Sequence, residues 1–341
     1  MKLQTAAYTG IVVSVVSVIA FTLIFGVSTS DILAVGPAAF ILASLVSAAR
    51  LVVQGIRFHV LSKGVNGNAN LRVGASAIAR MAAEFTDLVI PSYAGGEAVK
   101  IPWLLKRGFN VGQALLVAYF EVLLDVTIGG VISIIAALYL AAQGAYLASI
   151  ILLVLSSLWI GFFVAVPWLI SRGRRSLPKL LISVLSKIIG AKRAESFVES
   201  LDHAAMQSSD AARTFMKTSP KSVIVNSFIL TLIMVILAGT IFWIVALGSG
   251  LQIDLFTSIL AVYVSYTVGA IPLTPGGSGL AEGGIGLFVS SIYGGQLWAA
   301  IVAWRIISYH VPLAITGIAI LYLSHREIAT VSFKQEIKMP S

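Results

Sequence analysis

Residues Val268–Leu287, VGAIPLTPGGSGLAEGGIGL, determine how this chain must fold. The stretch lies in a strongly apolar sequence but holds two prolines, seven glycines and one carboxylate, Glu282. Interior proline removes a backbone hydrogen bond and glycine adds conformational cost, so a continuous transmembrane helix is not built this way. At membrane depth a broken helix is tolerated only where the freed backbone groups are buried in protein or line a polar cavity. The stretch therefore predicts two half-helices that meet at a break.

An earlier part of the chain has the same pattern. Ile90–Gly96 (IPSYAGG) and Ile271–Gly277 (IPLTPGG) are both I-P-x-x-x-G-G. A carboxylate follows each motif, Glu97 immediately and Glu282 five residues later. Two broken segments in corresponding halves of a chain are typical of the substrate site of a secondary transporter.

The composition is that of a polytopic membrane protein. Of the 341 residues, 58% are hydrophobic and 11% are charged, and the mean hydropathy is +0.97; a soluble chain carries about a quarter charged residues. The absence of cysteine excludes disulfides and thiolate metal sites, and the four histidines lack the HExxH spacing of a zinc site. The net charge is +9. In a membrane protein the distribution of this charge among the loops indicates the topology and the contact with anionic lipid. We expect no metal, no cofactor and no nucleic-acid partner.

The lengths of the apolar runs and the positions of Lys and Arg predict the topology, since about 20 apolar residues span a bilayer and basic loops stay in the cytoplasm. Full helices are expected at Tyr8–Gly26, Ile32–Val53, Val111–Ala142, Tyr146–Ile170, Ser222–Leu247 and Trp298–Leu323. We interpret the first as a retained helix and not as a signal peptide. Arg50, Arg57, Lys63 and Arg72 mark the end of the second helix and place the next loop inside. Both termini are then cytoplasmic.

Two segments around the breaks have arms too short to span comfortably. Residues 73–107 are flanked by basic residues, including Lys106 and Arg107, which predicts a hairpin that enters from the cytoplasm and returns to it. Residues 253–293 are flanked by Asp254 and have no Lys or Arg nearby, which predicts a hairpin entering from outside. Opposite charge at the ends of the two hairpins is typical of an inverted-topology repeat. Two tilted short spans at each place would give the same topology and stay open as an alternative.

The predicted fold is an all-α polytopic membrane protein with about six full transmembrane helices plus two inverted re-entrant broken-helix hairpins, in a single membrane domain over residues 1–341. Residues 1–170 form the first half and 222–323 the second. Between them, residues 171–221 carry ten Lys or Arg against four Asp or Glu, with apolar positions at helical spacing. This favours an amphipathic cytoplasmic helix in contact with anionic inner-leaflet lipid. Residues 324–341 form a cytoplasmic tail.

Charged residues inside the membrane are costly and face a cavity or a partner by default. Arg80, Glu84 and Asp87 share one helix face, where an internal Arg80–Glu84 ion pair is as good an interpretation as a functional role. Glu121 and Asp125 are four residues apart and repel each other when both are ionised. One of them is expected to be protonated or to bind a cation, which with Asp87 suits proton or ion coupling. A structural role for the pair is equally open.

The two glycine-rich helix starts offer groups that bind an anion. Such starts expose N–H groups at the positive end of the helix dipole. The candidate groups lie at Gly95, Gly96, Gly276, Gly277, Ser278 and Gly279. Glu97 and Lys100 begin the half-helix after the first break, where Glu97 is either a substrate ligand or a simple capping carboxylate. Two such starts converging at the midplane would form a cradle for a phosphate.

Arg305 lies well inside the last helix, too deep to reach the interface easily. Tyr309 follows on the same face at i+4. We expect the guanidinium to reach the cavity and to bind a phosphate through two N–H groups. The alternative is a permanent ion pair with Glu282 or Glu121.

An enzymatic role is not expected. The sequence has no Walker loop, no HxxxxD acyltransferase pattern and no DxD glycosyltransferase signal. The charged residues of the apolar segments also lack the nucleophile and base constellation of a catalytic site.

The motifs resemble those of one membrane family. IPSYAGGEAVKIPWLLKRGF, from Ile90, is similar to its P-x-x-x-G-E-x-x-[KR] element, and IPLTPGGSGLAEGG, from Ile271, to its P-x-x-P-G-G-x-G-x-x-E element. The late Arg305-x-x-x-Tyr309-x-x-Pro312 is also similar. This is the flippase-like integral membrane family that contains the transmembrane region of lysylphosphatidylglycerol synthases, with stand-alone members in bacteria and archaea. The resemblance identifies this chain as a stand-alone member without the aminoacyltransferase domain, in the plasma membrane of a prokaryote.

The resemblance implies movement of a lipid across the bilayer: aminoacylated phosphatidylglycerol in bacterial proteins and polyprenyl-linked sugars in archaeal relatives. The residues that match by position are Glu97, Lys100, Pro275, Gly276, Gly277, Gly279, Glu282 and Arg305. We expect a flippase for an anionic, phosphate-bearing lipid, in which the glycine N–H groups, Arg305 and Lys100 hold the phosphate. Glu97 and Glu282 would face a cationic or hydroxylated headgroup or carry a proton.

Two other functions stay open at this point. Broken helices fit an ion-coupled secondary transporter of a small solute equally well. The chain could also be a non-catalytic membrane partner of a separate lipid-modifying transferase, with the basic residues 172–221 as the dock. A homo-oligomer is a further open partnership.

Overall fold

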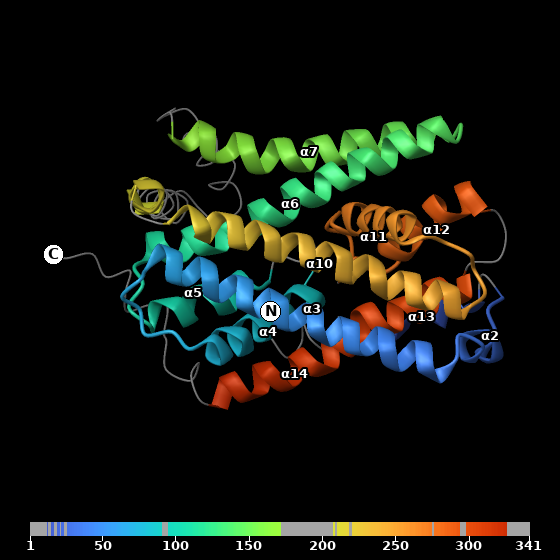
Figure 1. The fold of residues 1–341 in the computed structure, drawn as a ribbon, viewed down its shortest axis with the longest axis horizontal. Helices are drawn as coiled ribbons and strands as arrows, with labels where there is room; N and C mark the ends of the chain where they lie inside the picture. The colour runs from blue at the N-terminus through green and yellow to red at the C-terminus, as the bar shows by residue number, and fades with distance from the viewer. Residues whose placement is uncertain are drawn as a thin grey trace, which may run out of the picture.

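Long apolar stretches fold as helices in this protein because a helix satisfies its backbone groups within one segment, as a lipid environment requires. The computed structural model describes residues 26–90, 95–171, 207–217 except 209, 220–293 except 275, and 298–325, with scattered positions from 12 to 23. Its ordered elements in this part of the chain are helices (Figure 1). The predicted all-α polytopic class is thus confirmed.

Five helical runs in the described residues are long and apolar enough to cross a membrane. They are α3 (Pro37–Val65), α6 (Val111–Ala142), α7 (Tyr146–Ser171), α10 (Lys221–Gly248) and the last run, made of α13 (Trp298–Arg305), η1 (Ile306–His310) and α14 (Val311–Leu323). The bounds of α6 agree with the prediction. Most of the predicted first helix, residues 172–206 of the linker and residues 326–341 of the tail lie outside the described residues.

The second predicted helix, Ile32–Val53, was wrong at both ends. The chain first forms the short α2 (Thr29–Leu33), capped by Ser28, and α3 then runs from Pro37 to Val65. Arg57 was predicted to mark the end of the helix, but its side chain is fully buried within α3. A charged residue is tolerated inside an apolar helix where buried partners satisfy its charge, as Glu121 and Asp125 do here.

Each predicted hairpin forms two helices whose outer ends lie together. α4 (Val73–Val89) and α5 (Glu97–Leu105) form the first hairpin, and the side chain of Asn66 before it donates to the carbonyl of Gly108 after it at 3.3 Å. α11 (Leu255–Gly269) and α12 (Leu280–Tyr293) form the second, and Tyr293 at its end shares a side-chain hydrogen bond with Thr257 near its start.

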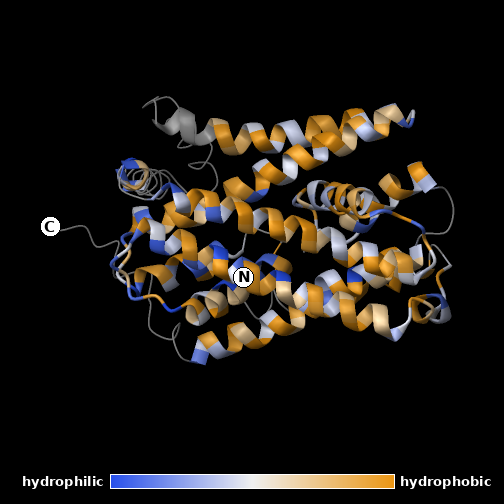
Figure 2. Cartoon of the chain, in the orientation of Figure 1, coloured by the Kyte–Doolittle hydropathy of each residue, from blue (hydrophilic) through white to orange (hydrophobic). Residues whose placement is uncertain are grey.

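The two hairpins begin at opposite ends of the bundle (Figure 1). The end with the first hairpin also holds the described residues 207–214, which share a recess with Val65 and Asn110. At the other end the α10–α11 turn lies near α2, where a Cβ on Gly248 would be 2.5 Å from the carbonyl oxygen of Val35. Hydrophilic residues gather at the first of these ends, whereas the long helices between the ends are largely apolar (Figure 2).

Two apolar clusters fill the bundle, and a small third cluster lies beside the end of α4. The larger one packs α10, α11, α12 and α13 with parts of α3, α6 and α7, and another packs α3, α4 and α5 with the start of α6 and the end of α14. The third consists of Leu88 and Val89 at the end of α4 with Tyr309 and Leu313 of the last helical run. The last run therefore connects the first hairpin to the second.

Gly276 shows how closely the second break packs. Its backbone has φ of 56°, in the left-handed region, and an added Cβ would lie 2.2 Å from the Tyr309 ring and 2.8 Å from the carbonyl oxygen of Leu88. We expect Gly276→Ala to destabilise the fold by about 2 kcal/mol or more, because left-handed backbone alone costs roughly 1–2 kcal/mol for a residue with a side chain.

Tryptophan fluorescence during heating in detergent measures this effect. Gly283→Ala is the matched control, because a Cβ at Gly283 in α12 meets nothing within 4 Å. An unfolding midpoint for Gly276→Ala equal to that of the control would contradict the packing described for the break.

Candidate functional site

The end of α4 and the loop before α12 lie against each other in the interior of the bundle. The hydroxyl of Tyr309 donates to the carbonyl of Leu88 at 2.9 Å, in a buried hydrogen bond that joins η1 to the end of α4. Leu88 is in the last turn of α4, so its carbonyl has no partner within that helix. Gly276 of the second break packs on both groups of this hydrogen bond. The end of α4 and the loop around Gly276, far apart in sequence, thus meet through Tyr309.

Arg305 binds the loop of the second break. Its Nη2 donates to the carbonyl of Gly276 at 2.7 Å and to the Ser278 hydroxyl at 3.0 Å, and its guanidinium carbon lies 4.2 Å from the centre of the Tyr309 ring. Its Nε is 2.8 Å from Oε1 of Glu282, and both side chains are buried. The ion pair that the sequence left open as an alternative is therefore present in this structure.

The break loop also binds the other oxygen of Glu282. The N–H of Gly279 donates to Oε2 of Glu282 at 2.8 Å. Gly276, Gly277 and Gly279 all have positive φ, in the left-handed region that glycine adopts readily, and the carbonyl of Gly276 and the N–H of Gly279 contact Arg305 and Glu282. The predicted anion cradle is thus occupied by a carboxylate of the chain itself.

A widened turn follows Arg305 in the last helical run. Pro312 has no backbone N–H, so the α-helical hydrogen bond to the carbonyl of Ser308 cannot form. The N–H of Val311 instead bonds to the carbonyl of Ile306, five residues back, and residues 306–310 form a π turn. Such turns occur often at functional sites. Here it lies between Arg305 and Pro312 and contains Tyr309.

The first break also has a carboxylate at its helix start. The N–H of Gly96 donates to Oδ1 of Asp87 at 2.6 Å, and Arg80 Nη1 is 3.5 Å from Asp87 Oδ2. The same Nη1 is 3.1 Å from Glu84 Oε2, which confirms the predicted Arg80–Glu84 ion pair. The contact to Gly96 makes Asp87, and not Glu97, the residue that satisfies the start of α5.

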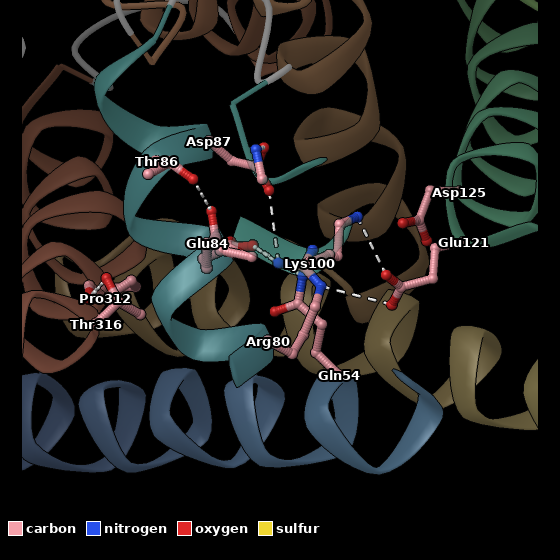
Figure 3. A network of polar contacts seen from close by, with 12 residues as sticks. Gln54, Arg80, Glu84, Thr86, Asp87, Lys100, Glu121, Asp125, Pro312 and Thr316 are labelled. Carbon is pink, nitrogen blue, oxygen red and sulfur yellow. Dashed lines mark hydrogen bonds and ion pairs between the residues drawn. The ribbon is translucent and has the colours of Figure 1, made fainter. Parts of the chain in front are cut away.

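Glu121 of α6 is the centre of a larger buried network (Figure 3). Its carboxylate lies 3.2 Å from Lys100 Nζ, 3.5 Å from Arg80 Nε and 3.6 Å from Arg57 Nη2. Lys100 also pairs with Glu97 at 3.0 Å. Lys100, which we predicted to hold phosphate, is therefore neutralised by two carboxylates in this structure.

Arg57 pairs with both carboxylates of α6, a contact that the sequence did not predict. It forms two hydrogen bonds to Asp125, one of 2.8 Å from Nη2, and donates from Nη1 to the Thr231 hydroxyl at 2.9 Å. The cation expected between Glu121 and Asp125 is thus an arginine of α3. A usable signal existed in the sequence, because after Val53 only the single Gly55 disfavours a helix before the glycines at Gly64 and Gly67.

The network contains more carboxylates than cations. Its connected cations are Arg50, Arg57, Arg80 and Lys100, and its carboxylates are Glu84, Asp87, Glu97, Glu121 and Asp125. The side chain of Asp125 is 42% exposed, although it lies near the middle of α6. Coupling to a proton or an ion through Asp87, Glu121 or Asp125 stays a prediction, and the excess of carboxylates over cations in the network is compatible with it.

The predicted site residues thus fall into two adjoining groups. Gly276, Gly277, Ser278, Gly279, Glu282, Arg305 and Tyr309 lie at the second break, and Asp87, Gly95, Gly96, Glu97, Lys100, Glu121 and Asp125 lie at or near the first. The hydrogen bond from Tyr309 to Leu88 links the two groups. Close packing requires glycine at position 95, since a Cβ on Gly95 would lie 2.4 Å from the Thr86 carbonyl oxygen.

We expect Arg57→Met to destabilise the fold by roughly 3–5 kcal/mol, because it leaves Asp125 and buried Glu121 without their shared cation. The unfolding midpoint in detergent measures the loss. The double variant Arg57→Met/Asp125→Asn should recover part of it, since the second change removes one unpaired charge. Equal stability of wild type and Arg57→Met would show that the network does not depend on Arg57.

Comparison with known proteins supports the architecture. The sequence profile described as the lysylphosphatidylglycerol synthase TM region matches residues 8–316. A UPF0104 membrane protein of Archaeoglobus fulgidus is 25% identical over 246 residues, which cover 71% of this chain and 74% of that protein. The profile match includes both breaks and Arg305.

Proposed function

Because the chain belongs to the family of lysylphosphatidylglycerol synthase transmembrane regions, we propose that it is a flippase, which moves an anionic, phosphate-bearing lipid between the leaflets of a membrane. The proposal rests on one observation above all. Two interrupted hairpins from opposite ends of the bundle meet at Tyr309, with buried charge at both interruptions. This is the arrangement in which a transporter holds its substrate near the midplane.

The surface beside the second break favours a lipid over a small solute. Leu273, in the loop that leads to the glycines, is 71% exposed, and Pro272 next to it is exposed as well. Within the same loop, Ser278 is buried against Arg305. An exposed apolar residue so close to a buried charge suits a site that opens laterally to acyl chains, with a polar interior for the headgroup.

The residues around the break supply what a phosphate needs. Arg305 would bind two phosphate oxygens through its planar guanidinium, and the hydroxyl of Ser278 and the N–H of Gly279 would donate to them. Arg80 and Lys100 are the cations that a phosphate would meet near the first break, in place of their present carboxylate partners. We propose that both hairpins are re-entrant, with the basic end of the bundle in the cytoplasm.

Headgroup translocation in proteoliposomes tests the proposal. Fluorescent phosphatidylglycerol, an aminoacylated phosphatidylglycerol and a polyprenyl-phosphate sugar are offered in turn to wild type and to Arg305→Lys. We expect Arg305→Lys to lower the translocation rate about tenfold or more, because lysine keeps the charge but not the two-pronged contact. Asp254→Asn, a change at the far outer end of α11, is the control and should leave the rate unchanged.

The outcome also separates this function from the alternatives. Equal background movement of every lipid by folded wild type and Arg305→Lys would exclude a flippase. Uptake of a soluble ion or solute by the same vesicles would then favour a small-solute transporter. Retention of a cytosolic transferase during purification would favour a membrane partner protein.

A further inference from the structure

Both breaks have the same local arrangement, although their sequences place the acidic residue differently. At the second, Glu282 accepts the N–H of Gly279 with one oxygen and faces Arg305 with the other. At the first, Asp87 accepts the N–H of Gly96 with one oxygen and faces Arg80 with the other. Asp87 precedes its break and Glu282 follows its break, so the pattern I-P-x-x-x-G-G does not reveal the equivalence.

In each case a carboxylate makes the contacts that the oxygens of a phosphodiester would make. A carboxylate and a phosphodiester each carry one negative charge when ionised, and both accept hydrogen bonds from backbone N–H and guanidinium. The displaced carboxylate stays attached to the chain, so it must turn toward water or take up a proton as the phosphodiester enters. The charge around the guanidinium then stays the same, and the site escapes the large desolvation penalty that an additional buried anion would bring.

Glu282 is more easily displaced than Glu84, the buried carboxylate of α4. Its side chain is 3% exposed, yet Oε1 accepts no hydrogen bond from the described residues, so that oxygen is held by charge alone. Glu84, another buried carboxylate, instead receives hydrogen bonds from Gln54 and Arg50 and contacts no break N–H in the described part of the chain. An oxygen without a hydrogen bond loses less when a substrate oxygen replaces it.

We propose that Glu282 and Asp87 are internal ligands that occupy the two phosphate sites when no substrate is bound, and that the phosphodiester of the lipid displaces them in turn. Glu282 returns to Gly279 and Arg305 as the headgroup leaves. This deepens the proposed function and uses the same sites. Asp87 and Glu282 thus act as competitors for the phosphate, whereas the sequence predicted coupling for Asp87 and, for Glu282, contact with the headgroup or proton transfer.

The proposal predicts an unusual response to substitution. When an internal carboxylate occupies the site in part of the molecules, the measured affinity for a ligand falls in proportion to the fraction of molecules whose site is free. Glu282→Gln weakens the internal ligand, so we expect it to bind phosphate-bearing ligands about tenfold more tightly than wild type. Translocation should become slower, because the headgroup is no longer displaced.

Calorimetric titration of the full chain in detergent measures the affinity. The ligands are dihexanoylphosphatidylglycerol and glycerol 3-phosphate, which distinguish a lipid headgroup from a free phosphate. Glu84→Gln is the matched control, because it removes the same charge beside Arg80 but no contact to a break N–H. Glu282→Asp keeps the charge and moves the carboxylate away from Gly279, so it should also bind more tightly, even if Glu282→Gln does not fold.

Tighter binding by Glu282→Gln, Asp87→Asn or Glu282→Asp, with little change for Glu84→Gln, is the expected result. Weaker binding by these variants would overturn the proposal, because the carboxylates would then be substrate ligands. An equal gain for Glu84→Gln would also overturn it, since the cause would be net charge. If affinity rises as expected but wild type moves no lipid, the competition stands and the flippase function fails.

Discussion

The hydrogen bond between Tyr309 and the carbonyl of Leu88 is the contact on which the interior of this protein depends. A helix that stops inside an apolar bundle leaves its last carbonyls without partners, and each unsatisfied group costs about 1–3 kcal/mol. The end of α4 is such a place, and Tyr309 satisfies it from another part of the chain. The same ring packs on Gly276 and lies under the guanidinium of Arg305. One side chain thus positions both interruptions.

The charges of the interior obey a related constraint, because a buried ion is stable only with partners. Arg57, Arg80 and Lys100 converge on Glu121, and Arg305 pairs with Glu282. These pairs hold the bundle together without an external ligand. In the described residues the carboxylates of the network already outnumber its cations, so a substrate anion must replace a carboxylate or bring in a proton. Packing and the proposed function therefore involve the same residues.

Much of this arrangement could be predicted from the sequence, for physical reasons that differ among the elements. α6 was predicted at its observed bounds because Gly108–Asn110 and Gln143–Ala145 stop the apolar run on either side. The breaks were predicted because proline and glycine interrupt helices locally. Arg57 was misplaced because its burial depends on Asp125 and Thr231, which are distant in sequence. The contact of Asp87 with Gly96 was missed because the spacing of a motif does not show how a loop turns back.

Photolabelling of the wild-type protein tests the central claim, that a lipid phosphate binds where the two breaks meet. A phosphatidylglycerol that carries a photoreactive group on its headgroup is incorporated into nanodiscs with the protein, and the labelled residues are identified by mass spectrometry. The account predicts labels in residues 271–282 and 87–100 that excess unlabelled phosphatidylglycerol suppresses. Labels confined to the loops at the two ends of the bundle would contradict it.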